Sequence, residues 1–182
     1  MKVVRTALLD ELKKWYNGYS WDGSTRLYNP FSVLSFFDSG SFQNFWYNTG
    51  TPYFLVELIK RERFDITATE NMIAVEESLS SDDLDRPQLK SLLFQTGYLT
   101  IKKRNRQQYS DYFELGFPNH EVESSFSRYL FAEMTNTEAD LTGIYAAEIK
   151  VALQRGDYET FEKHLKFLFA KIPSNLFIPE ER

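Results

Sequence analysis

The stretch Tyr98–Leu115, YLTIKKRNRQQYSDYFEL, carries the clearest β signal in the sequence. Apolar and polar residues alternate over 98–103 and again over 109–115, and the residues between them, 104–108, are all polar. Alternation with a period of two is typical of half-buried strands, and a short polar connection between two such runs indicates a hairpin. The sequence therefore predicts a β-hairpin over 98–115.

Helical patterns flank the predicted hairpin on both sides. Residues 87–96 show helical spacing and end at Gly97, while Pro118 and Asn119 form a typical helix start. The residues expected to face the core are Leu89, Leu92 and Leu93 before the hairpin and Val122, Phe126, Tyr129 and Leu130 after it. A short helix followed by a hairpin with a basic tip is the arrangement of a winged-helix module. We therefore predict a winged-helix-like centre over 65–135.

Asparagines, glycines and prolines punctuate the first 64 residues, and aromatic side chains lie between them. A helical pattern over 4–15 is followed by Gly18, which we predict to end the helix in the left-handed conformation. The residues after it predict two short strands joined by a tight turn at Asp22–Gly23. This part of the chain is therefore expected to be helical, with a small β ribbon.

A second helix is predicted to begin at Asn29, whose side chain can cap it, with Pro30 in the first helical position and Gly40 at the end. Its expected buried residues are Phe31, Val33, Leu34 and Phe37. Aromatic stripes at helical spacing are usually core. We therefore interpret the aromatic residues of this region as packing groups, and a ligand pocket is the alternative.

The last part of the chain predicts two consecutive helices. A helical pattern runs over 141–154, and Gly156 with Asp157 provides a helix end followed by a helix cap. The second helix carries an apolar stripe of Phe161, Leu165, Leu168, Phe169 and Ile172. Taken together, the patterns predict a mainly α (α+β) fold. Its three predicted regions are a helical region over 1–64, the winged-helix-like region over 65–135 and a helical hairpin over 136–182.

Composition limits the functions that the chain can have. It has 182 residues, no cysteine and a formal net charge of −5. The lack of cysteine excludes disulfides and thiol catalysis, and it is typical of proteins of a reducing cytoplasm, the location that we expect. No apolar run approaches the roughly 20 residues that span a bilayer, so a membrane is not an expected partner.

The sequence shows no motif for catalysis. The phosphate loop G-x-x-x-x-G-K-[ST] is absent, and His120 and His164 fall in different predicted helices without metal-ligand spacing. Two E-x-K triplets, 11–13 and 148–150, are similar to the metal-binding triplet of some nucleases, but both lie in helical patterns instead of on a strand. Acidic residues within 76–85 are interpreted as an exposed loop. We therefore expect no catalytic, cofactor-binding or metal-binding residue in this chain.

Two clusters are candidates for binding. Cations gather at the tip of the predicted hairpin within an otherwise acidic chain: Lys102, Lys103, Arg104 and Arg106. One hypothesis is that they bind the phosphates of nucleic acid, and the alternative is a charged tip that protects a strand edge from aggregation. The second candidate is a protein-interaction surface of exposed aromatic residues, namely Phe42, Phe45, Trp46 and Tyr47.

Six consecutive blocks of the sequence resemble one group of bacterial proteins. The blocks are LKKWYNGYSWDG, RLYNPFSVLSFF, FWYNTGTPYFLVELI, LLFQTGYLTIKK, ELGFPNHEVESSF and ALQRGDYETFEKHLKFLFAKIPSNL, in this order. The group, common in Bacteroides-type bacteria, consists of AAA-ATPase-like proteins with a C-terminal PD-(D/E)XK nuclease-like domain. The resemblance covers nearly the whole chain.

This resemblance implies that the chain is the central part of a larger protein. In the family, the phosphate loop lies upstream of the first block, and the nuclease carboxylates and lysine lie downstream of the last. The implied cofactors of the larger protein are ATP and Mg²⁺. The implied partners are its ATPase and nuclease-like regions, with nucleic acid as a further one. Arg5, Arg26 and Arg61 are candidates for an arginine that senses nucleotide. The chain itself is expected to couple the two regions without catalysis.

Overall fold

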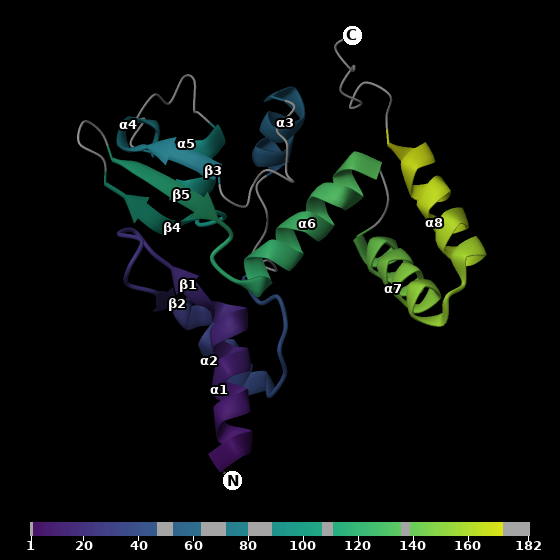
Figure 1. Cartoon of the computed structure of the whole chain (residues 1–182), viewed down its shortest axis with the longest axis horizontal. Coiled ribbons are helices and arrows are strands. Elements are labelled where there is room, and N and C mark those ends of the chain that lie inside the picture. The colour runs from purple at the N-terminus through teal and green to yellow at the C-terminus, as the bar shows by residue number, and fades with distance from the viewer. Residues whose placement is uncertain are drawn as a thin grey trace. The chain divides into compact units, whose positions relative to one another are not determined.

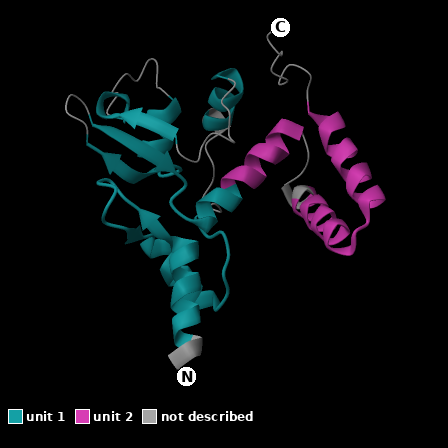
Figure 2. Ribbon diagram, in the orientation of Figure 1, with its two compact units in different colours: residues 1–125 teal, residues 126–182 magenta. Residues whose placement is uncertain are grey.

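The computed structural model describes residues 2–46, 53–62, 72–79, 89–106, 111–135 and 139–172. Its elements, shown in Figure 1, are α1 (Lys2–Tyr16), β1 (Asn17–Tyr19), β2 (Leu27–Tyr28), α2 (Pro30–Ser39), α3 (Tyr53–Glu62), β3 (Met72–Val75), α4 (Glu76–Leu79), α5 (Leu89–Gln95), β4 (Thr100–Asn105), β5 (Tyr112–Gly116), α6 (His120–Thr135), α7 (Ala139–Arg155) and α8 (Tyr158–Lys171). The chain divides into two compact units, residues 1–125 and 126–182 (Figure 2). Helices predominate and the strands form small antiparallel sheets, so the predicted mainly α (α+β) fold is confirmed. The limits of the three predicted regions stay predictions.

A three-stranded antiparallel sheet forms the centre of the first unit (Figure 1). Its strand order is β3-β5-β4, and α4 and α5 lie between β3 and β4 in the sequence. The predicted hairpin is present as β4 and β5, which pair from Thr100 opposite Gly116 to Asn105 opposite Tyr112, with a bulge at Lys102. A helix, a strand, two helices and a two-stranded wing follow one another as in a winged-helix module. The order of these elements and the strand order of the sheet are compatible with a winged-helix-like centre, which stays a prediction.

Helices α5 and α6 bury nearly the residues that the sequence predicted. The buried members of the predicted sets are Leu89 and Leu93 in α5 and Val122, Phe126 and Leu130 in α6, while Leu92 and Tyr129 are half-buried. The predicted loop over 76–85 is wrong at its start, because Glu76–Leu79 forms the single helical turn α4. Its remaining acidic residues, Asp82, Asp83 and Asp85, lie outside the described residues.

Residues 2–46 form a helical subregion of the first unit, which we call the N-terminal lobe. After α1, strands β1 and β2 pair antiparallel, as predicted. Gly18 does not cap α1 in the predicted way, because it lies within β1 with a φ of 138°. A Cβ at this position would lie 1.9 Å from the carbonyl oxygen of Pro118. Glycine is therefore required here for the close approach of two backbone segments and not for a helix end.

Helix α2 begins and ends as predicted but buries a different face. The Asn29 side chain accepts from the backbone of the first turn, and Gly40 closes the helix with a φ of 70°. The buried residues are Ser32 and Phe36, and Phe36 packs on Leu12 and Tyr16 of α1. The predicted face is largely exposed: Phe31 is 51% exposed, Leu34 69% and Phe37 68%, and Val33 is half-buried. This helix is apolar on most sides, so its spacing does not decide which face is covered.

The second unit contains the predicted helical hairpin of α7 and α8. Gly156 has a φ of 69°, and the Asp157 carboxylate caps α8 by accepting from Thr160 N at 3.0 Å. Only part of the predicted apolar stripe is buried: Leu168 is buried, Phe161, Leu165 and Ile172 are half-buried, and Phe169 is 54% exposed. The expectation that Phe169 faces inward is therefore wrong, because two helices alone cover only a narrow stripe of each other.

Candidate functional site

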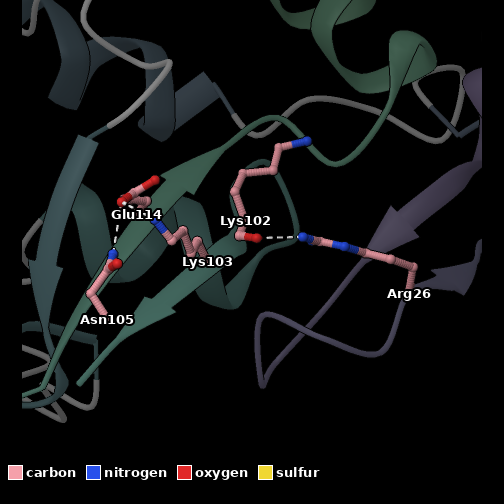
Figure 3. A network of polar contacts seen from close by, with 5 residues as sticks. All are labelled: Arg26, Lys102, Lys103, Asn105 and Glu114. Atoms are coloured by element: carbon pink, nitrogen blue, oxygen red, sulfur yellow. Dashed lines mark hydrogen bonds and ion pairs between the residues drawn. The ribbon is translucent and has the colours of Figure 1, made fainter.

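The cations of the hairpin are largely engaged within the hairpin itself. Lys103 Nζ lies 3.7 Å from Glu114 Oε1, and the two side chains face each other in Figure 3. Arg104 donates two hydrogen bonds, of 2.9 and 2.6 Å, to Asp111 Oδ2. Lys102 Nζ lies 3.5 Å from a backbone carbonyl oxygen of the segment after β5. Three of the four predicted nucleic-acid-binding cations therefore already have partners.

The remaining cation, Arg106, is exposed and makes no ion pair with the described residues. Helix α5, which precedes the hairpin as the recognition helix does in a winged-helix module, carries Lys90 as its one charged residue, and Lys90 Nζ donates to Ile73 O at 3.3 Å. Affinity for nucleic acid depends on the number of phosphates that free cations neutralise. Nucleic-acid binding stays a prediction, and the geometry weighs against it.

The edge of β4 is covered by the segment that follows β1. Ser20 N donates to Thr100 Oγ1 at 2.6 Å, and Ile101 N donates to Ser20 O at 3.2 Å. The guanidinium of Arg26 donates to Ile101 O at 2.7 Å and to Lys102 O (Figure 3). These bonds join the N-terminal lobe to the sheet across 75 or more positions of sequence. We call this set, Ser20, Arg26, Thr100, Ile101 and Lys102, the latch.

Asp22 organises the loop inside the latch. Its carboxylate accepts from the backbone N–H groups of Ser24 and Thr25, both at 2.8 Å, and from their hydroxyl groups at 2.8 and 3.0 Å. These bonds, led by the one from Ser24 N, hold the pKa of Asp22 well below its usual range. Gly23 brings the loop against β4, since a Cβ there would lie 2.9 Å from Arg104 N. The predicted tight turn is therefore wrong: residues 20–26 form a longer loop between β1 and β2, and this loop contacts β4.

Besides the latch, a buried carboxylate, Glu121, makes a second set of hydrogen bonds between distant segments of the first unit. It lies in the first turn of α6 and is fully buried. Its Oε2 accepts from Ser32 Oγ of α2 at 2.7 Å, and its Oε1 accepts from Trp46 N at 2.7 Å. Burial raises the pKa of Glu121, and the hydrogen bonds from Trp46 and Ser32 partly offset that rise. Sequence reasoning missed this residue, because glutamates near helix starts are usually exposed.

An open apolar groove of about 370 Å³ lies in the first unit. Its aromatic lining consists of Tyr19, Trp21, Tyr28 and Trp46, and none of the described residues that line it is charged. A Cβ at Gly97 would lie 3.4 Å from the Tyr19 ring and 4.0 Å from that of Trp46, which is ordinary contact, so glycine suits this position through its backbone φ of 83° and not through lack of space. Burial raises the pKa of Tyr19 to about 12. The volume lies within the range of binding pockets, so the ligand-pocket alternative gains support for these aromatic residues.

The aromatic residues predicted to form an exposed surface are only partly exposed. Phe42 and Phe45 pack against the core of the N-terminal lobe, Trp46 is half-buried in the groove, and Tyr47 lies outside the described residues. The large apolar residues that the N-terminal lobe does expose from β1 onward are Trp21, Leu27, Tyr28, Phe31, Leu34 and Phe37. The exposed apolar surface therefore lies on β2 and α2 and not on the segment after them.

The remaining candidates of the sequence lie on helices or at the surface. Both E-x-K triplets are helical, in α1 and α7, and Glu148 Oε2 is 3.3 Å from His164 Nε2. The His120 ring packs edge-on against Trp15, with centroids 4.6 Å apart. Within the described ranges, no group of three His, Asp or Glu side chains could hold a metal ion. None of the described helices combines the length and the apolar character needed to cross a membrane.

Of the three arginines considered as nucleotide sensors, Arg26 belongs to the latch. Arg61 is exposed, 3.9 Å from Glu62, and Arg5 is exposed on α1. The structure therefore gives Arg26 a backbone-binding role, and it leaves the guanidinium groups of Arg5 and Arg61 at the surface.

Comparison with known proteins shows that the sequence is similar to part of a longer protein. A protein of Azotobacter chroococcum mcd 1, described as "Uncharacterized protein in vnfD 5′region", is 32% identical over 168 residues. The match covers 92% of this chain and 32% of the relative, so the chain spans about a third of the length of the curated relative that it matches. No protein-family model matches the chain, and no solved structure matches it.

Proposed function

We propose that this chain is a non-catalytic coupling segment of a larger cytoplasmic protein that joins an AAA-ATPase-like region to a nuclease-like region. In this role, the N-terminal lobe receives movement from the ATPase-like region and passes it to the winged-helix-like sheet. The α7–α8 hairpin then leads toward the nuclease-like region. ATP and Mg²⁺ act on the larger protein and not on the residues of this segment. The observation that carries the proposal is the latch.

The latch supports this role because it is built from strong bonds between distant parts of the chain. Hydrogen bonds from a guanidinium are charge-assisted, and Arg26 makes them to two neighbouring carbonyl groups of β4. Glu121 makes a second set of hydrogen bonds at a different place, between α2 and α6. The latch joins the N-terminal lobe to β4, and Glu121 joins it to the start of α6, which follows β5 in the sequence. We therefore expect the N-terminal lobe and the sheet to move together. The longer relative supports the place of the chain within a larger polypeptide.

The first test is the mass of the native product in its source cell, measured with an antibody raised against this chain. A band well above 21.4 kDa is the expected result. A band at 21.4 kDa would refute the coupling role, because no flanking regions would then be present to couple.

The second test breaks the latch in the purified chain by Arg26→Ala, with Arg5→Ala as the matched control. Loss of the guanidinium bonds is expected to cost about 1.5–3 kcal/mol and to increase hydrogen exchange at the β4 amides. Tryptophan fluorescence reports on the N-terminal lobe, because all three tryptophans lie in residues 15–46, and hydrogen exchange of 112–116 reports on the sheet. In the parent and in Arg5→Ala, the two probes should report the same unfolding midpoint. In Arg26→Ala, they should report different midpoints for the N-terminal lobe and the sheet. Coincident unfolding in all three would defeat the mechanical role of the latch.

A further inference from the structure

Strand β4 is an edge strand of the three-stranded sheet, and within the described part of the chain a loop, instead of a fourth strand, covers its outer side. Ile101 offers both of its backbone groups to this loop. Its N–H donates to Ser20 O at 3.2 Å, and its carbonyl oxygen accepts from Arg26 at 2.7 Å. Arg26 also donates to Lys102 O (Figure 3). An added antiparallel strand binds the same pair of groups, so the latch fills a strand-addition site.

The covering loop, residues 20–26, is held together mainly by its own bonds. Its internal hydrogen bonds converge on the Asp22 carboxylate, and Ser20 is its only buried residue. Its hydrogen bonds to β4 come from the Ser20 backbone and the Arg26 guanidinium alone. Opening a surface loop that makes few bonds costs much less free energy than global unfolding. The loop is therefore a unit that can leave β4 while the core stays packed.

The charges beside this edge favour an acidic occupant. The hairpin has three consecutive cations and two carboxylates here, namely Lys102, Lys103, Arg104, Asp111 and Glu114. The carboxylates pair with Lys103 and Arg104, so three positive charges against two negative ones leave one positive charge. The side chain of Lys103 stays 64% exposed. The present occupant brings a carboxylate to this place, because Asp22 precedes Gly23, whose Cβ would lie 2.9 Å from Arg104 N.

We infer that the latch is an autoinhibitory contact: it closes a strand-addition site on β4, and an extended acidic segment of a partner protein takes its place when the latch opens. The partner's backbone pairs with the N–H and carbonyl groups of Ile101, and its carboxylates lie beside Lys103. Main-chain hydrogen bonds supply the affinity in this mode of recognition, and the neighbouring charges supply the selectivity. The inference goes beyond the coupling role and does not depend on it.

Two other occupants fit the site less well. Strand β4 of a second copy would place lysine and arginine opposite lysine and arginine, and like charges opposite each other destabilise a strand pair. The phosphate groups of nucleic acid accept hydrogen bonds but donate none, so they would leave the Ile101 carbonyl without a partner. An extended polypeptide satisfies both backbone groups of Ile101 at once, and acidic side chains on it complement the charge of the strand.

The test uses the whole chain and a fluorescein-labelled synthetic peptide of about eight residues, in which valine and threonine alternate with glutamate. A twin peptide carries lysine in place of every glutamate. Fluorescence anisotropy compares the parent with Arg26→Ala, which weakens the latch, and with Arg5→Ala as the matched control. The glutamate peptide should bind Arg26→Ala about tenfold or more tightly than it binds the parent or Arg5→Ala, because the intact loop competes from within the chain. Added salt should weaken this binding, and the lysine twin should bind about fivefold or more weakly.

Hydrogen exchange and further variants locate the site. Bound peptide should slow exchange of the β4 amides in Arg26→Ala. In that background, Lys103→Ala should weaken binding about two- to fivefold, whereas Lys150→Ala, which removes an exposed lysine of α7, should leave it unchanged. Circular dichroism checks that each variant folds. Arg26→Lys serves as a second latch variant, since an ammonium group does not bridge two carbonyl groups as a guanidinium does, and it should bind the peptide at least about threefold more tightly than the parent.

Four outcomes would overturn the inference. They are the absence of saturable binding to both latch variants up to about 1 mM peptide, equal affinity of the parent and the latch variants, equal binding of the lysine twin, and binding that leaves exchange of the β4 amides unchanged. The second would show that the latch does not close the site, and the fourth would place the peptide elsewhere on the chain. None of these outcomes decides whether the N-terminal lobe and the sheet unfold together, so the coupling role is tested separately.

Discussion

Replacing Glu121 is the most direct test of the buried hydrogen bonds that connect α6 with the N-terminal lobe. In Glu121→Ala, the hydroxyl of Ser32 and the backbone N–H of Trp46 both lose the acceptor that now lies 2.7 Å away. Each buried donor left without an acceptor lowers the free energy of unfolding by about 1–3 kcal/mol. Removing the buried carboxylate charge offsets part of this loss, because the charge no longer has to be desolvated. We expect a net loss of about 3 kcal/mol in the free energy of unfolding.

Glu121→Gln separates the effect of charge from the effect of hydrogen bonding. The amide oxygen can still accept from Trp46 N, and the amide N–H can donate to the hydroxyl oxygen of Ser32, which rotates to suit. The shape of the site is kept and the buried charge is removed. We expect this variant to lie within about 1 kcal/mol of the parent near neutral pH.

The contribution of Glu121 to the free energy of unfolding depends on pH, and the direction follows from its raised pKa. Burial raises the pKa of Glu121 above its ordinary value of 4.5, so the folded state binds this proton more tightly than the unfolded state. The contribution of Glu121 to stability is therefore greatest below pH 4.5, and it falls as the pH rises through the pKa of the folded state. Glutamine does not titrate. The stability of Glu121→Gln relative to the parent should thus increase between about pH 4 and pH 7.

The assay is urea unfolding followed by tryptophan fluorescence, which reports on the first unit because all three tryptophans lie within it. A difference between Glu121→Gln and the parent that stays constant with pH, or that decreases as pH rises, would refute the proposed burial of the charge. A loss of less than about 1 kcal/mol in Glu121→Ala would show that the two donors find other acceptors.

Further substitutions test the loop around Asp22 and the close contact between backbones. Gly18→Ala should lower the free energy of unfolding by about 3 kcal/mol or more, because its Cβ would lie 1.9 Å from the Pro118 carbonyl oxygen. Gly143→Ala should instead stabilise α7 by about 0.5–1 kcal/mol, because a Cβ there meets nothing within 4 Å. Urea unfolding followed by circular dichroism measures both, and equal effects would contradict the packing described. Asp22→Asn should lower Tm near neutral pH, and the difference should shrink as pH falls through the depressed pKa of the folded state. A Tm difference that persists unchanged in acid would count against the role of the charge.

Local signals in the sequence located most element boundaries. Asn29, Gly40 and Asp157 act at helix ends as their side-chain chemistry and backbone freedom predict, and alternation over 98–115 located the hairpin. These features depend on a few neighbouring residues. They can therefore be inferred without knowledge of which distant segments meet.

Features that depend on distant contacts could not be predicted in this way. The burial of Ser32 in place of Leu34 requires an acceptor 89 positions away, and the conformation of Gly18 requires the backbone of Pro118 beside it. The latch and the groove likewise combine residues near 19–30 with residues near 96–102. The resemblance suggested the setting of the chain but no functional side chain within it.

The position of Glu121 has a consequence for synthesis of the protein on the ribosome. Leu12, Tyr16 and Phe36 can gather as soon as the N-terminal lobe has left the exit tunnel, because their contacts are short in sequence. Ser32 and the Trp46 N–H then have no carboxylate to bind until some 75 to 89 further residues have been translated. The emerging lobe is thus an incomplete intermediate until β4 and then α6 have been translated, so a nascent chain stalled before Glu121 lacks the buried carboxylate and should be more open to proteolysis and to chaperone binding than the finished chain.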